Sequence, residues 1–196
     1  MKRLLYLLIL LPIVPLTLSA QADKYITILH TSDMHSCIEP DGKTGLGGVV
    51  RRATFVEQMR KNKPNTLLVD CGDFSQGSLY YNLFKGETEV MMMNAMGYDV
   101  ATIGNHEFDF GLDNMMRIFA MAEFPIVSTN YDFTGTPVEA FVRPYHIMKV
   151  DGVRVGFVGV GPQLEGLVAE ELRRLGMAEV AAENGRVFCA GRPADI

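Results

Sequence analysis

Short segments typical of β-strands alternate with segments of helical periodicity along the first two thirds of this chain. The most constraining segment is residues 66–70, whose centre is apolar without alternation, as expected for a strand buried on both faces. Further strands are predicted at residues 25–30, 100–103 and 126–130, and helices at about 48–62, 87–96 and 111–123. This alternation predicts an α/β fold with a parallel sheet.

The pattern changes after residue 144. Residues 145–150 and 153–160 flank Asp151-Gly152, a dipeptide typical of two-residue hairpin turns. Residues 164–175 are compatible with a helix, but the rest of the chain to Ile196 shows no clear period. We therefore divide the chain into a folded domain at residues 23–163 and a divergent tail at residues 164–196.

The N-terminus has the layout of a secretory signal peptide. Lys2 and Arg3 precede an almost wholly apolar run, and small residues before Ala22 suit cleavage after it. The run is shorter than the roughly 20 residues that a membrane span requires, which favours cleavage over an uncleaved anchor. We expect residues 1–22 to be removed, leaving a periplasmic or secreted protein without a stable membrane span.

Net charge argues against a nucleic acid polymer as partner. Loss of Lys2 and Arg3 lowers the basic count from 18 to 16 against 23 acidic residues, which gives a net charge of −7. The sequence has no Lys/Arg cluster that would form a phosphate-binding stripe. An acidic protein that acts on anionic esters needs local positive charge, which bound metal cations provide.

Three cysteines leave at least one thiol unpaired within the chain. Cys37 and Cys71 follow two strands that we expect to lie side by side, so a disulfide between them is one interpretation. Small buried thiols are the other.

Three short polar clusters follow three consecutive predicted strands. Asp33 and His35 are two residues apart, so that in an extended chain both side chains point the same way. The carboxylate of Asp73 can bridge two ions, and Asn105 offers a neutral oxygen ligand. Each cluster alone is equally typical of a capped loop or turn. Together they are specific, because sites in parallel sheets gather beyond the carboxyl ends of the strands.

These clusters and their neighbours resemble the first three motifs of the calcineurin-like metallophosphoesterases. The sequence is most similar to the catalytic domain of bacterial 5'-nucleotidases, in Leu29-His30-Thr31-Ser32-Asp33-x-His35, Gly72-Asp73-Phe74-Ser75-Gln76-Gly77-Ser78 and Gly104-Asn105-His106-Glu107-Phe108-Asp109. The resemblance covers about residues 24–163. It implies an incomplete four-layer α/β/β/α sandwich, of which this chain would hold mainly the first half.

The resemblance also implies a two-metal hydrolase of small phosphate esters, in particular one that splits a nucleoside monophosphate into nucleoside and phosphate. Asp33 and His35 would bind the first divalent metal, Asp73 would bridge both metals, and Asn105 would bind the second. The sequence does not distinguish zinc, manganese, magnesium and calcium. His106 would not be a ligand but would protonate the leaving oxygen, oriented by Asp109.

Four further residues near the motifs have less specific interpretations. We expect His30 to hold the first loop by a hydrogen bond. Gln76 and Ser78 either line the site or form a turn. His146 matches no ligand position, and a packing or surface role is expected.

The histidine count departs from the family pattern. The family places a histidine after the hairpin and a Gly-His-x-His cluster beyond it, whereas none of the four histidines here follows His146. Two protein ligands rarely hold a transition metal tightly, so the second ion should bind weakly. The chain is then an enzyme with an incomplete ligand set, a catalytically inactive remnant left by truncation or frameshift, or half of a split enzyme completed by a separate chain. One face of its sheet is expected to be exposed.

Overall fold

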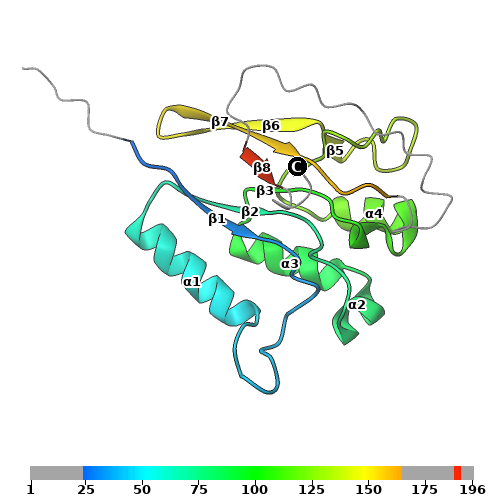
Figure 1. Ribbon diagram of the computed structural model, residues 1–196, viewed down its shortest axis with the longest axis horizontal. Coiled ribbons are helices and arrows are strands. Elements are labelled where there is room, and N and C mark those ends of the chain that lie inside the picture. Colours follow the sequence, from blue (N-terminus) through cyan, green and yellow to red (C-terminus); the bar gives the residue numbers. More distant parts are fainter. Residues whose placement is uncertain (1–23, 165–187, 191–196) are drawn as a thin grey trace, which may run out of the picture.

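The structure is a computed structural model that describes residues 24–164 and 188–190 (Figure 1). The predicted signal peptide and most of the predicted tail lie outside these residues. Among the described residues, no helix combines the length and apolarity of a membrane span.

Five strands form a parallel sheet whose spatial order follows the chain. They are β1 (Thr27–Thr31), β2 (Thr66–Asp70), β3 (Val100–Ala101), β4 (Ile126–Val127) and β5 (Val142–Arg143). Helices connect the first four strands: α1 (Val49–Asn62), α2 (Leu79–Phe84), α3 (Glu87–Met96), the 3₁₀-helix η1 (His106–Phe108) and α4 (Gly111–Phe119). The predicted parallel sheet is confirmed, and every residue of β2 is buried as its sequence requires.

The second sheet packs on the face opposite α1 and α3 (Figure 1). Its strands β6 (Tyr145–Val150) and β7 (Val153–Gly159) are antiparallel, and β8 (Phe188–Ala190) runs parallel to β7. Both turn residues have positive φ, 47° at Asp151 and 81° at Gly152, as a type I′ hairpin turn demands. The predicted hairpin is therefore confirmed.

Two apolar cores hold these layers together. Val155 and Phe157 of β7 pack between the sheets against Val69 of β2 and Val127 of β4. On the other face of the first sheet, the helices bury a larger cluster that includes Met93 and Phe108. The layers are thus helix, sheet and sheet, which matches the expected fold class. The second helical layer of the sandwich is not among the described residues.

The outer face of the β6–β7 hairpin is open. Tyr145 and Ile147 are 57% and 43% exposed, whereas Phe157 on the inner face is 3% exposed. The expected exposed sheet face is therefore present in the part of the chain that the structure describes.

Several elements differ from prediction. Strands β3 and β4 are only two residues long, and α4 ends at Phe119 rather than at residue 123, where Met121 and Ala122 donate turn hydrogen bonds to Ile118 and Phe119. The sequence did not reveal α2, which begins where the Ser78 hydroxyl accepts a hydrogen bond from the Tyr81 backbone N–H at 3.2 Å. Nor did it reveal β5 and β8, which are too short to show a period.

The cysteine interpretations are both corrected. Cys37 and Cys71 are free thiols, so no disulfide joins them. Cys37 is exposed and Cys71 half-buried, because the loops after β1 and β2 reach the surface at the edge of the sheet. The side chain of Cys189 lies outside what the structure describes.

Candidate metal centre

The loops that follow β1 and β2 run side by side beyond the sheet. The backbone N–H groups of Asp33, His35 and Ser36 donate to the carbonyls of Gly72, Asp73 and Phe74 at 3.0–3.1 Å. These bonds continue the β1–β2 pairing past the ends of both strands. The first two predicted clusters are therefore fixed against one another by backbone alone.

Two glycines bring the third cluster equally close. A Cβ atom at Gly72 would lie 2.6 Å from the backbone nitrogen of Gly104, and a Cβ at Gly104 would lie 2.2 Å from Oδ1 of Asp73. Real Cβ atoms do not approach so closely, so only glycine fits at either position. Gly72 thus allows the loop that carries Asp73 to approach the backbone of Gly104 closely.

Three predicted site residues meet where these loops converge. His35, Asp73 and His106 each offer a ligand atom, and these atoms all lie within 4.8 Å of one another. Asp33 lies beside them, with its Oδ1 3.8 Å from Nε2 of His35. A carboxylate and imidazoles are a donor set that suits a divalent transition metal. The residues present therefore fit at least one cation.

Both histidine rings are held through Nδ1. His106 Nδ1 lies 2.9 Å from Oδ2 of Asp109, and His35 Nδ1 lies 3.0 Å from Oε1 of Gln76. The rings contact each other edge to face, with centroids 5.1 Å apart. The His106 backbone N–H also donates to Oδ1 of Asp73 at 2.9 Å, which ties η1 to the central carboxylate.

Glu107 lies beneath the cluster and is fully buried. Its carboxylate accepts the backbone N–H groups of Asp73 and Gly104, at 3.0 and 2.7 Å, and both the N–H and the hydroxyl of Ser75. Burial and the nearby Asp73 carboxylate raise the pKa of Glu107. From sequence, Glu107 was apparent only as part of a motif, because its bridging role depends on tertiary contacts.

Asp70 is a second buried carboxyl, at the end of β2. It accepts hydrogen bonds from the Thr31 hydroxyl at 2.6 Å and from the Gly72 backbone N–H at 2.9 Å. Burial raises its pKa to about 8. The hydrogen bond to Gly72 ties this carboxyl to the loop that carries Asp73.

Backbone strain concentrates in the same loops. Asp33, His35, Ser36, Asp73 and Gln76 all have positive φ between 43° and 80°. Non-glycine residues adopt this region rarely and cost energy there, and clusters of such residues occur at functional sites. The strain is offset by the interloop hydrogen bonds and by the buried Glu107 network.

The remaining predicted residues lie outside the cluster of three. Asn105 directly precedes η1, and its carbonyl accepts the Phe108 N–H at 3.2 Å. His30 is exposed and makes no side-chain hydrogen bond within the described residues, so its expected role in holding the loop is wrong. Ser78 caps α2 and contacts the Ser36 hydroxyl, which makes it a structural residue. His146 lies in β6, opposite Phe157 and away from the cluster.

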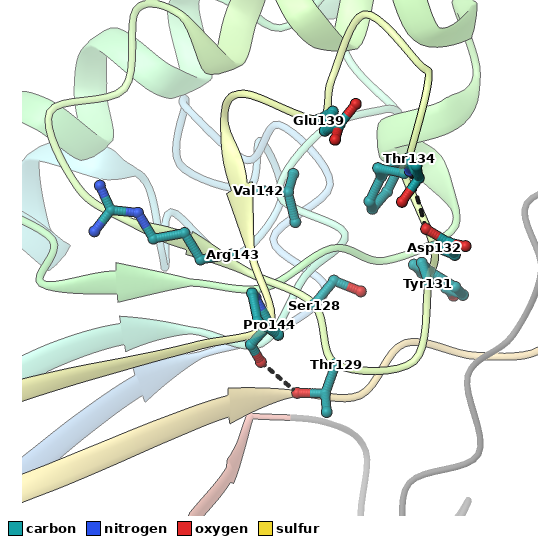
Figure 2. A pocket seen from close by; sticks show the side chains of 10 residues that line it. Ser128, Thr129, Tyr131, Asp132, Thr134, Glu139, Val142, Arg143 and Pro144 are labelled. Carbon is teal, nitrogen blue, oxygen red and sulfur yellow. Dashed lines mark hydrogen bonds between the residues drawn. The ribbon is translucent and has the colours of Figure 1, made fainter.

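A pocket of about 450 Å³ lies beyond the end of β4 and next to β5 (Figure 2). Ser128, Asp132, Thr134 and Glu139 contribute to its lining, and none of the predicted site residues does. Tyr131 lines this pocket, and its ring also contacts Phe108 of η1 with centroids 5.6 Å apart.

The chain is similar to known phosphoesterases. The sequence profile of the calcineurin-like phosphoesterases matches residues 26–172. The 5'-nucleotidase of Rattus norvegicus is 38% identical over 169 residues, which cover 80% of this chain and 29% of that protein. The snake venom 5'-nucleotidase of Gloydius brevicauda is 38% identical over 146 residues, covering 68% of this chain and 25% of that protein.

Comparison with solved structures also finds similarity to a 5'-nucleotidase. The 5'-nucleotidase precursor from Thermus thermophilus superposes with a TM-score of 0.67 at 32% identity, covering 70% of this chain and 29% of that one. The chain therefore spans less than a third of the length of these relatives. A profile of the RlmL ferredoxin-like domain matches residues 157–196, a much shorter stretch that overlaps the first match and lies mostly beyond the described residues.

Proposed function

This chain belongs to the calcineurin-like phosphoesterase family, and from that premise we propose that it carries part of the catalytic machinery of a metal-dependent 5'-nucleotidase. The observation that carries the proposal is the meeting of His35, Asp73 and His106 within 4.8 Å at the carboxyl ends of three neighbouring parallel strands. The relatives named 5'-nucleotidase support a nucleoside monophosphate as the substrate.

Within this proposal, Asp33, His35 and Asp73 hold a first divalent cation, and Asp73 with Asn105 holds a second more weakly. When bound, the cations would activate water as the nucleophile at neutral pH and would offset the charge of the phosphate ester. The protein contributes orientation, because the Glu107 network and the interloop hydrogen bonds fix the Asp73 carboxylate before substrate arrives.

His106 acts as the proton donor in this proposal rather than as a ligand. The Asp109 carboxylate lies 2.9 Å from Nδ1 and keeps a proton on that nitrogen, which leaves Nε2 available for proton transfer. A protonated Nε2 can then transfer its proton to the leaving oxygen as the phosphoester bond breaks.

Phosphate release from a nucleoside monophosphate by the purified chain, with Mn²⁺ or Zn²⁺, tests the activity. We expect His106→Ala to lower the rate of the chemical step by about 100-fold or more, while calorimetric metal binding is retained. Loss of metal binding in His106→Ala would instead make His106 a ligand. If no divalent ion supports turnover, this chain does not catalyse hydrolysis by itself.

A second candidate is a chain that keeps the fold without catalysis, either as a remnant or as half of a split enzyme. The exposed outer face of β6–β7 favours it. Calorimetry separates the candidates, since two tightly bound ions per chain would count against an inactive remnant. Copurification with a second polypeptide that restores turnover would support the split enzyme.

We also propose export, with residues 1–22 as a cleaved signal peptide and a periplasmic or secreted mature chain. The layout of the N-terminus supports this, and similarity to a venom protein agrees with it. N-terminal sequencing of the exported protein would test the cleavage after Ala22.

The boundary between the domain and the tail at residue 163 is likewise a proposal, and the family match extends past it to residue 172.

A further inference from the structure

Gln76 combines a strained backbone with a directed side chain. Its φ is +80°, a conformation that glycine adopts freely and that glutamine adopts at a cost. The next residue, Gly77, also has a positive φ of 100°. A turn alone would favour glycine or asparagine at position 76. The turn therefore does not explain why a glutamine occupies this position.

The side chain of Gln76 reaches one specific atom. Its Oε1 lies 3.0 Å from Nδ1 of His35, across the two facing loops. An amide oxygen only accepts hydrogen bonds, so this contact requires a proton on Nδ1 and leaves the lone pair of the neutral ring on Nε2. Nε2 is the nitrogen that faces Oδ1 of Asp33 at 3.8 Å. His35 therefore offers its free nitrogen on the side where Asp33 lies.

The loop does not need this side chain for its shape. His35 already donates its backbone N–H to the Asp73 carbonyl at 3.0 Å, and Gly77 lies close to the His35 backbone. Ser36 is further held by contacts with Ser78 and Glu89. Backbone contacts therefore already position these loops. The additional effect of the Gln76 amide is to hold the His35 ring.

We propose that Gln76 is a positioning residue, which fixes the Nδ1–H tautomer and the ring orientation of His35 so that Nε2 is presented to a divalent cation. The role rests on the proposed function, because it assigns His35 to metal binding. A metal-bound histidine has a second ring nitrogen that hydrogen-bonds to a neighbouring residue. Removing that neighbour typically lowers metal affinity by about 10- to 100-fold.

The test uses the full chain and three variants. Gln76→Gly removes the acceptor and relieves the positive φ. Gln76→Glu keeps an acceptor of greater basicity at the same place. Lys85→Gly is the matched control, because Lys85 also has a positive φ, of 53°, but lies at the end of α2, outside the group of candidate ligands.

Three measurements are made on each protein. Nitrogen-15 NMR of the metal-free protein, at a pH where imidazole is neutral, reports the tautomer of His35. Calorimetry with Mn²⁺ and with Zn²⁺ reports affinity, and urea denaturation reports stability. A turn-forming role for Gln76 predicts that Gln76→Gly matches the wild type in all three or is more stable.

The positioning role predicts a different pattern. Gln76→Gly keeps or raises the urea midpoint, loses the Nδ1–H tautomer, and binds the cation about 10- to 100-fold more weakly. Gln76→Glu keeps both the tautomer and the affinity, and Lys85→Gly changes neither.

Two results would overturn the positioning role: an Nε2–H tautomer of His35 in the wild type, or wild-type affinity in Gln76→Gly. A wild-type chain that binds neither ion would instead overturn the proposed function. In that case an Nδ1–H tautomer lost in Gln76→Gly would show that Gln76 orients the His35 ring without a role in metal binding.

Discussion

At the scale of single residues, the site depends on groups that bind no substrate. Glu107 joins the loops after β2 and β3 through four hydrogen bonds, and Gly72 and Gly104 allow those loops to touch. A buried carboxylate that lost these partners would carry an uncompensated charge, so the network is cooperative. The geometry of Asp73 is therefore a property of its neighbours.

Gly104→Ala tests this dependence. The added methyl group would fall 2.2 Å from Oδ1 of Asp73, so the carboxylate must move. We expect weaker metal binding by calorimetry and a loss of stability of roughly 1–3 kcal/mol, as for other overpacked sites. Gly156→Ala is the control, because a Cβ there meets nothing within 4 Å. Equal effects of the two substitutions would contradict the steric explanation.

Asp70 gives the protein a pH-dependent stability. Its pKa is raised by burial from 3.8 to about 8, so the folded chain holds this proton more tightly than the unfolded chain does. The stabilisation is complete below the unfolded pKa and is lost as the pH rises through the folded pKa. Urea midpoints should therefore fall between pH 5 and pH 9.

Asp70→Asn should flatten that dependence, because an amide does not titrate. The variant should also be the more stable protein at pH 9, where the wild type would bury a charge. An unchanged fall in the urea midpoint would show that another group is responsible.

At the scale of elements, the β6–β7 hairpin has one face committed to the core and one face open. Phe157 packs between the sheets, whereas Ile147 is 43% exposed on the outer side. Alternation along each strand places these residues on opposite faces. The hairpin is thus fixed to the first sheet while it presents apolar side chains outward.

Substitutions on the two faces should differ in cost. Phe157→Ala leaves a cavity in the core between the sheets and should lower the free energy of unfolding by about 3–5 kcal/mol. Ile147→Thr should change it by less than about 1 kcal/mol, because its side chain is already partly hydrated and threonine suits a strand. Chemical denaturation measures both. A large loss in Ile147→Thr would mean that another part of the chain covers the outer face.

At the scale of the whole molecule, cation binding and folding should be coupled. The candidate ligands come from loops that meet only in the folded chain, so an ion bound there favours folding. At 100 times its dissociation constant, Mn²⁺ or Zn²⁺ should add about 2.7 kcal/mol to stability. Asp73→Asn should abolish the shift in thermal midpoint, while Asp113→Asn on α4 should retain it. An equal shift in both variants would place the ion elsewhere.

Much of the architecture follows from local pattern. The helix α1 begins one residue from its predicted start, and α3 has its predicted bounds, with Gly97 at its C-terminal cap in the left-handed conformation. Strand β2 and the hairpin were likewise predictable, because an unbroken apolar run and an Asp-Gly turn are strong local signals. Short elements such as α2, β5 and β8 were missed, since they are stabilised by neighbours rather than by their own periodicity.

The sequence by itself determined which chemical groups this protein has and the order in which strands carry them to one edge of a sheet. Only the tertiary structure decided which atoms face each other across the loops: the Gln76 amide on His35, and the Glu107 carboxylate on the loop that carries Asp73 and Ser75. Hydrophobic periodicity is encoded locally, within a few residues. The contacts across the loops join residues 32–41 positions apart, and they exist only because β1, β2 and β3 lie side by side.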